Sequence, residues 1–301
     1  MTMTASASIR YGICVVLTGI FVLAGCAVGP DFKAPEVETP EAYRTQVMPS
    51  APARDLKWWE LFEDPQLEEL VIFALQNNRD IKIAMSRIEQ ARATVGFNRA
   101  DRFPRVDAEA GAQRGNFSGG SLSSDVNSTV YLAAPLSWEL DFWGKYKRAT
   151  DAARAELTAS EYGLRAAQLL LISDVVSNYY QLLDFQRRLA ISESTLNSRL
   201  DSLKIIEQRF ANGIIAELDV NQAQIQKEIA AAAVPLYKRS IALAENRLSV
   251  LLGRLPGAID ASLPHTGISQ PPEIPVGIPS DILAHRPDIG QARYLLEAQT
   301  N

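Results

Sequence analysis

Residues 182–210 read "LLDFQRRLAISESTLNSRLDSLKIIEQRF", and this stretch decides the fold because an apolar side chain returns in it every seven residues. The repeated positions are Leu182, Leu189, Leu196, Leu203 and Phe210. Such a sustained heptad repeat is typical of a coiled coil. The stretch lies in a segment, Lys145 to Phe210, that has no proline and only one glycine, Gly163. We therefore expect one helix of roughly 100 Å, at 1.5 Å per residue.

A turn and a second helix follow. The turn lies in "ANGIIAELD" (211–219), where Gly213 is suited to a left-handed C-terminal cap. The second helix ends at "LLGRLPG" (251–257), and we expect Pro235 to kink it. Its heptad repeat consists of Ile229, Leu236, Leu243 and Val250. An ordinary helical bundle is the alternative, but the length of the segments favours a projecting helical hairpin.

Upstream of the long helix, the period of the apolar pattern changes from 3.6 to 2. Residues 104–114 alternate, residues 115–125 ("GNFSGGSLSSD") predict a polar loop, and residues 126–142 alternate over a length sufficient for a tilted membrane strand. Aromatic residues near its end, such as Trp138 and Trp143, suit a membrane interface. A soluble hairpin packed on helices is the alternative. Because a lone hairpin has unpaired edges, a membrane wall would need partner strands from elsewhere.

The first helix begins near "DPQLEELVIFALQNNRDI" (64–81), with Asp64 as N-cap and Pro65 at the first helical position. Apolar spacing continues to Ala100, so we expect one helix over this range. The last segment repeats it weakly. "LQNNRDIKIAMSRIEQ" (75–90) and "LAHRPDIGQARYLLEA" (283–298) share identical residues at one offset of 208 positions. The second copy stops as its helix begins, and we expect a truncated reading frame or an incomplete sequence.

The N-terminus predicts where the protein resides. An apolar run from Tyr11 to Ala24 follows a single charge at Arg10, and it is too short to span a bilayer. The run ends in Leu23-Ala24-Gly25-Cys26, which resembles a bacterial lipoprotein signal. That resemblance implies removal of residues 1–25 and acylation of the Cys26 thiol, for example by palmitate. It also implies sorting to the outer membrane, because Ala27 follows the cysteine. An ordinary signal peptide with a chance cysteine is the alternative.

Composition argues against several classes of function. The net charge is −5, from 30 Lys and Arg against 35 Asp and Glu, and no basic block suggests a nucleic acid partner. His265 and His285 have no Cys or carboxylate neighbours at ligand spacing, so we expect no metal site. We find no phosphate-binding loop and no nucleophile motif. We therefore expect no catalytic residues, no cofactor and no enzymatic activity.

Six motifs together resemble one family. They are "AVGPDFKAP" (27–35), "DPQLEELVIFALQNNRDI" (64–81), "WELDFWGKYKRA" (138–149), "RFANGIIAELDVNQAQ" (209–224), "NRLSVLLGRLPG" (246–257) and "IPSDILAHRPDI" (278–289). The combination resembles the outer-membrane factor family, specifically the lipoprotein (OprM/NodT) branch of TolC-like channels that serve RND-type efflux. The resemblance covers residues 22–298. It implies a mainly α fold in which a long antiparallel coiled-coil hairpin accompanies two strands of a shared transmembrane β-barrel.

The domain organisation that we expect has seven parts. They are a lipoprotein signal peptide (1–25), an extended tether (26–60), the first helix (61–103), a transmembrane β-hairpin (104–143), a periplasmic coiled-coil hairpin (144–256), a Pro-rich connector (257–280) and the start of a second repeat (281–301).

The resemblance also implies partners and sites. It implies a homotrimer in outer-membrane lipid, whose helices form a tunnel that meets a periplasmic adaptor and an inner-membrane RND pump. The turn at Gly213, Ile214, Ile215 and Asp219 matches the family's helix tip, where the adaptor binds. A plain capped turn is the alternative there. Glu139 and Asp141 share one strand face, and in a barrel that face lines the water-filled lumen.

The resulting expectation is a passive channel component that exports drugs or other small molecules. One alternative is a periplasmic adaptor lipoprotein, which also has an anchor and a coiled-coil hairpin. Another is an envelope enzyme such as a peptidoglycan hydrolase, for which Glu139 and Asp141 are the nearest carboxylate pair. The family pattern contains two repeats and this chain carries one, so we expect the chain as given to be a non-conducting fragment.

Overall fold

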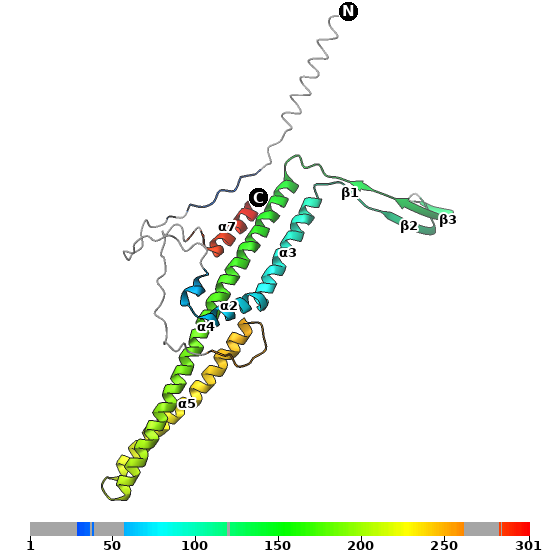
Figure 1. Cartoon of the computed structure of the whole chain (residues 1–301). Helices are drawn as coiled ribbons and strands as arrows, with labels where there is room; N and C mark the ends of the chain where they lie inside the picture. The colour runs from blue at the N-terminus through cyan, green and yellow to red at the C-terminus, as the bar shows by residue number, and fades with distance from the viewer. Residues whose placement is uncertain (1–28, 37, 39–56, 119–120, 262–282, 284) are drawn as a thin grey trace, which may run out of the picture. The chain divides into compact units, whose positions relative to one another are not determined.

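A computed structural model describes residues 29–36, 38, 57–118, 121–261, 283 and 285–301 (Figure 1). The fold is mainly helical with one β-hairpin, as predicted. The chain divides into two compact units. One comprises Met1–Val37, Arg87–Glu161 and Gly290–Asn301, and the other comprises Glu38–Ser86 and Tyr162–Ile289. Each unit is described separately below.

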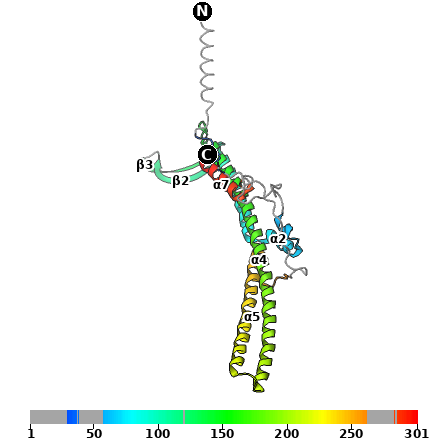
Figure 2. The same cartoon turned by 90° about the vertical axis from the view of Figure 1, so that its left-hand side faces the viewer.

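The long helix and its return are confirmed. Helix α4 runs from Lys145 to Ala211, and helix α5 runs from Glu217 to Leu251, continuing through Pro235. They lie antiparallel and side by side along the length of α5 (Figure 2). Among the described residues, no helix is both long enough and apolar enough to cross a membrane.

The turn between α4 and α5 is a Schellman cap. Gly213 has φ +69, its N–H donates to the carbonyl of Phe210 at 2.8 Å, and the N–H of Ile214 donates to the carbonyl of Arg209 at 3.0 Å. These two bonds satisfy carbonyls that the end of α4 leaves without helical partners. The predicted glycine cap is therefore confirmed.

The heptad repeat predicted for the returning helix does not face α4. Ile229, Leu236, Leu243 and Val250 are all exposed, at 46–68%. The less exposed stripe of α5 is a different heptad, consisting of Val220, Ala223, Lys227, Ala230, Val234, Tyr237, Ile241, Ala244 and Leu248. Four of these nine residues are alanine or lysine, so a repeat of large apolar side chains does not identify this heptad. Small side chains on this heptad allow the two helices to approach closely. Because it is this heptad that faces α4, the stripe of Ile229, Leu236, Leu243 and Val250 stays uncovered on another side of α5.

The core of the second unit lies where α4 meets three other helices. These are the 3-10 helix η1 (Trp58–Phe62), helix α2 (Pro65–Asn77) and the end of α5. The largest fully buried side chains are Leu67, Val71, Val175, Tyr179, Leu182, Leu248 and Leu252. Asp64 caps α2 as predicted, since its Oδ1 accepts from the N–H groups of Gln66 and Leu67 at 3.0 and 3.2 Å. The end of the predicted tether (26–60) is helical, because η1 begins at Trp58.

The single helix predicted to end at Ala100 is two helices. Helix α2 ends at Asn77, and helix α3 runs from Arg79 to Ala100. Asn78 lies between them with ψ 138, outside the helical region. Its Oδ1 accepts from the N–H groups of Asp80 and Ile81 at 2.8 and 3.1 Å. The prediction was wrong here because the Asn78 side chain starts a new helix in place of the continuing backbone hydrogen bonds.

The β-hairpin belongs to the first unit, and its strands differ from the prediction. Strand β2 (Glu109–Ser118) pairs antiparallel with β3 (Ser121–Ala133), and two-residue strands β1 (Arg105–Val106) and β4 (Leu136–Ser137) pair nearby. Most of the predicted loop at 115–125 is therefore strand. The predicted strand 126–142 is interrupted after Ala133, because Pro135 has no N–H to donate to a ladder.

The last described helix lies in the segment predicted to start a second repeat (281–301), and the repeat itself stays a prediction. Helix α7 runs from Pro287 to Thr300 and carries Asp288 in its first turn, as α3 carries Asp80. The corresponding acidic positions stabilise the positive N-terminal end of each helix.

Candidate functional site

The predicted tip residues lie together where α4 joins α5, with Asp219 in the first turn of α5. Ile214 and Leu218 are well exposed, and Ile215 is partly buried. Asp219 has a structural partner, because its Oδ2 accepts from the N–H of Ala216 at 3.3 Å at the start of α5. The carboxylate thus supports the turn, while the apolar side chains of Ile214 and Leu218 are available for contact. Apolar residues grouped on an exposed turn are typical of a binding surface.

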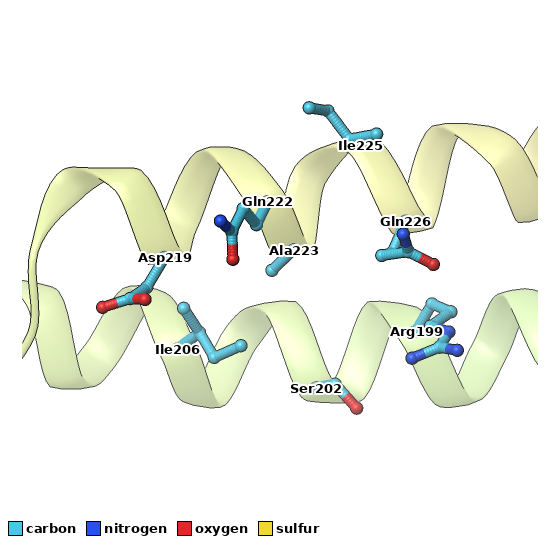
Figure 3. A pocket seen from close by; sticks show the side chains of 8 residues that line it. All are labelled: Arg199, Ser202, Ile206, Asp219, Gln222, Ala223, Ile225 and Gln226. Atoms are coloured by element: carbon cyan, nitrogen blue, oxygen red, sulfur yellow. The ribbon is translucent and has the colours of Figure 1, made fainter.

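A hollow of about 410 Å³ lies beside the tip, between the two helices (Figure 3). Its lining residues are Arg199, Ser202 and Ile206 from α4, and Asp219, Gln222, Ala223, Ile225 and Gln226 from α5. Ile206 points toward α5, and Gln222 and Ala223 point toward α4 (Figure 3). The small side chains of Ser202 and Ala223 leave space that larger residues would fill.

The hollow adds amide and guanidinium groups to the apolar tip. Gln222 and Gln226 can donate and accept hydrogen bonds, and Arg199 can bind a carboxylate in bidentate geometry. Sequence reasoning missed the two glutamines. A signal was present, however, since Arg199 lies at the second apolar position of the heptad, where Phe185 and Ile206 lie in other repeats. A polar residue at a position that faces the partner helix departs from the apolar pattern of a coiled coil, and it marks this part of the helix pair as unusual.

The predicted lumen-facing carboxylates, Glu139 and Asp141, lie after the last strand. Glu139 Oε1 accepts from Lys145 Nζ at 3.0 Å, and its Oε2 accepts from the hydroxyl of Tyr146. Asp141 Oδ2 accepts from the N–H of Lys147 at 2.8 Å. Both carboxylates are therefore bound to the first turn of α4, where the helix dipole favours negative charge. The two carboxylates thus connect the hairpin to the helix. They are not arranged as the paired carboxylates of an enzyme's active site.

A second hollow, of about 750 Å³, lies at the base of the β-hairpin. Its walls include the aromatic side chains of Phe97, Phe103, Trp138 and Tyr146. Trp138 is held by a hydrogen bond of 3.3 Å from its Nε1 to the carbonyl of Arg102. Of the aromatic residues predicted near this end of the strand, Trp138 lines the hollow, whereas Phe142 and Trp143 are not among its lining residues and contact each other.

Several predicted features lie outside the described residues, namely the signal peptide (1–25), Cys26, His265, and most of the tether (26–60) and of the Pro-rich connector (257–280). His285 is described, at an exposed position just before α7. Within the described part of the chain, no three His, Cys, Asp or Glu residues are grouped so that they could hold a metal ion.

Comparison with known proteins identifies the family. Residues 70–254 match the family model described as outer membrane efflux protein. The chain belongs to this family. The family assignment and the mainly helical fold predicted from the sequence are therefore confirmed, and the family is not enzymatic. Membership favours a channel component over a periplasmic adaptor.

Relatives agree with this assignment. The chain is 33% identical to the "Probable outer membrane lipoprotein SilC" of Salmonella typhimurium, over 94% of this chain and 62% of that protein. It is 34% identical to the "Toluene efflux pump outer membrane protein TtgI" of Pseudomonas putida, over 93% and 62%. It resembles the solved outer-membrane channel OprN with a TM-score of 0.79 and 33% identity, over 91% of this chain and 63% of that one. The chain thus spans about 60% of the length of the curated relatives it matches.

Proposed function

We propose that the chain is the outer-membrane component of a tripartite, RND-type efflux system that exports drugs or other small molecules passively. The observation that carries this proposal is the α4–α5 hairpin, which ends in an exposed apolar turn beside a polar hollow. Family membership supports the role. The export step needs no chemistry from this chain, because a conduit lowers the barrier to diffusion and leaves energy coupling to its partners.

The tip is the proposed contact with a periplasmic adaptor. Gly213, Ile214 and Ile215 form the turn, and Asp219 supports it from the first turn of α5. Leu218 extends its apolar surface. A helical partner that inserts an apolar side chain between the helices would find space at Ala223 and hydrogen-bonding groups at Gln222 and Gln226. The inner-membrane RND pump is the further partner that this arrangement implies.

Exposed apolar surfaces support assembly into a homotrimer. The stripe of Ile229, Leu236, Leu243 and Val250 runs along α5 and is uncovered in the single chain. The pair β2–β3 leaves both of its edges without partner strands among the described residues. Packing the stripe against a neighbouring helix and pairing the strand edges would remove both features from water.

The β-hairpin is the part proposed to contact outer-membrane lipid. Val130 and Leu132 are 82% and 83% exposed on one face of β3. Trp138 and Trp143 lie beyond the strand end, where amphipathic rings suit a lipid headgroup region. Acylation at Cys26 is the proposed anchor, since several acyl chains contribute about 0.8 kcal/mol per buried methylene.

Site-specific photo-cross-linking tests the proposed tip. A benzophenone amino acid replaces Leu218 in one variant and Leu255 in another, since both leucines are exposed and lie at opposite ends of α5. In Gram-negative cells that express a complete tripartite pump, the Leu218 variant is expected to form a product containing the periplasmic adaptor, identified by mass spectrometry. Equal cross-linking from Leu255, or none from Leu218, would contradict the assignment of the tip.

A further inference from the structure

Arg148, in the first turn of α4, joins three segments that are far apart in the sequence. Its guanidinium donates to Asp31 Oδ1 at 3.0 Å, to the carbonyl of Gly29 at 3.4 Å, and to Asn301 Oδ1 at 3.1 Å. All four residues belong to the first unit. The contacts therefore connect the N-terminal segment with the start of α4 and the end of α7.

The environment of Arg148 differs from that of other arginines in the same unit. Its side chain is 16% exposed, whereas that of Arg154, in the next part of α4, is 54% exposed. Arg154 pairs only locally, with Asp151 at 2.9 Å. Withdrawing a guanidinium from water is unfavourable unless its N–H groups find acceptors. Arg148 has three acceptors from two other segments, so its burial is compensated by the contacts it makes.

We infer that Arg148 is a positioning residue that fastens the N-terminal segment, residues 29–36, to the first turn of α4. The planar guanidinium suits this task because its N–H groups can reach several acceptors at once. The Asp31 side chain is 90% exposed, so the ion pair alone contributes little. The additional bond to the Gly29 carbonyl fixes the backbone itself, and Phe32 in the same segment is partly buried.

The fastening has a consequence for the membrane anchor, which rests on the proposed acylation of Cys26. Cys26 is three residues before Gly29. Three extended residues span at most roughly 10 Å. Arg148 would therefore hold the acylated residue close to the base of α4, and it would set the distance between the lipid surface and the helices. A freely moving tether would leave that distance undefined.

Proteolysis after Lys33 tests the fastening directly. Lys33 is exposed and lies two residues after Asp31. A protease must draw several residues into its active site, so cleavage here requires release of the segment. Membranes containing the full chain are treated with a lysine-specific protease, and the new N-terminus at Ala34 is quantified by mass spectrometry. The variants are Arg148→Ala, Arg148→Lys and Asp31→Ala, with Arg154→Ala as the matched control.

Cleavage after Lys33 is expected to accelerate about threefold to tenfold in Arg148→Ala, which loses all three bonds. In Asp31→Ala it is expected to accelerate only about twofold to threefold, because this variant loses the solvated ion pair and keeps the bond to the Gly29 carbonyl. Arg148→Lys is expected to accelerate it as well, because an ammonium group lacks the planar fork. Arg154→Ala is expected to match the unchanged chain. Asp31→Ala keeps the test valid if the loss of Arg148 disturbs the fold, since the Asp31 side chain lies almost wholly in solvent. An unchanged rate in Asp31→Ala, with or without acceleration in Arg148→Ala, overturns the inference.

A separate measurement distinguishes this inference from the proposed anchor. Cleavage after Lys33 separates Cys26 from the helices, so the body of an acylated chain loses its lipid attachment. The mass of the released N-terminal peptide reports directly whether Cys26 carries acyl chains. An unmodified peptide would contradict the proposed lipidation, while the variant-dependent cleavage rates would still decide whether Arg148 fastens the segment.

Discussion

The side-chain amide of Asn78 donates a hydrogen bond of 2.8 Å to the main-chain carbonyl of Leu251, across 173 residues of sequence. Asn78 also caps α3 through its Oδ1. One buried side chain thus satisfies the start of one helix and the end of another. The contact connects the α2–α3 junction with the end of α5.

The first prediction concerns Asn78. Replacing it with Ala leaves the Leu251 carbonyl and the first N–H groups of α3 without these partners. We expect the free energy of unfolding to fall by about 2–4 kcal/mol. Urea unfolding followed by circular dichroism measures the change. The control is Asn77→Ala, because the Asn77 amide donates only to the carbonyl of Phe73 in its own helix, at an exposed position. Equal losses in the two variants would refute the proposed role of Asn78.

The second prediction concerns Gly253, which follows α5. Its φ is +67, and a Cβ added there would lie 2.4 Å from the carbonyl oxygen of Asn77. We expect Gly253→Ala to destabilise the chain by more than about 2 kcal/mol, from backbone strain together with a clash against a main-chain atom. Gly213→Ala is the matched control, since Gly213 has φ +69 and open space around its Cβ position. That variant should lose only about 1 kcal/mol. Thermal unfolding compares the two, and similar losses would show that the close approach to Asn77 contributes nothing.

Long-helix boundaries were predictable because they depend on local signals. The segment predicted as Lys145 to Phe210 is helix α4, Lys145–Ala211, and its end coincides with a glycine that can adopt positive φ. The break at Asn78 was missed because apolar spacing continues across it. A signal existed, since Asn is a preferred N-cap and Asp80 follows in the first turn. The longer helical pattern is the stronger signal over this range, and it hides the break.

The seam of α5 shows why packing is harder to predict than helicity. Two heptads coexist on this helix, and side-chain hydrophobicity alone favours the one with larger apolar residues. The structure turns the alanine-containing heptad inward. Hydrophobicity identifies the side chains that are better buried than exposed. It does not indicate whether they are covered by the same chain or by another one. The tip hollow was missed for the same reason, because Gln222 and Gln226 have no apolar signal.

The third prediction concerns alkaline pH. Burial raises the pKa of Tyr179, and its hydroxyl donates a hydrogen bond of 2.8 Å to Asp64 Oδ2, which raises that pKa further. A tyrosine with a raised pKa in the folded state contributes stability that is fully present below the unfolded pKa of about 10. That stability is lost as the pH rises above 10, because the unfolded chain releases the proton first.

Unfolding midpoints in urea between pH 8 and pH 11 measure this effect. We expect the stability of the unchanged chain to fall more steeply above pH 10 than that of Tyr179→Phe, which has no hydroxyl to ionise. Tyr294→Phe, in α7 of the other unit, serves as the control and should keep the steep fall. If Tyr179→Phe follows the same pH profile as the unchanged chain, ionisation of Tyr179 does not limit alkaline stability.

The last prediction tests the corrected seam with two neighbouring residues of α5. Ala244 is 3% exposed on the inner heptad, and Leu243 is 54% exposed on the outer one. Ala244→Leu forces extra methylenes into a packed site, so we expect a loss of about 1–3 kcal/mol in the free energy of unfolding. Leu243→Ser removes an apolar side chain that the single chain does not cover, so its unfolding free energy should change by less than about 0.5 kcal/mol.

If the outer stripe serves assembly, Leu243→Ser should also lower the self-association measured by sedimentation, while Ala244→Leu tests only the fold. The reverse order of stabilities, with Leu243→Ser the more damaging, would restore the heptad first predicted from the sequence and remove the uncovered stripe on which the proposed trimer contact depends.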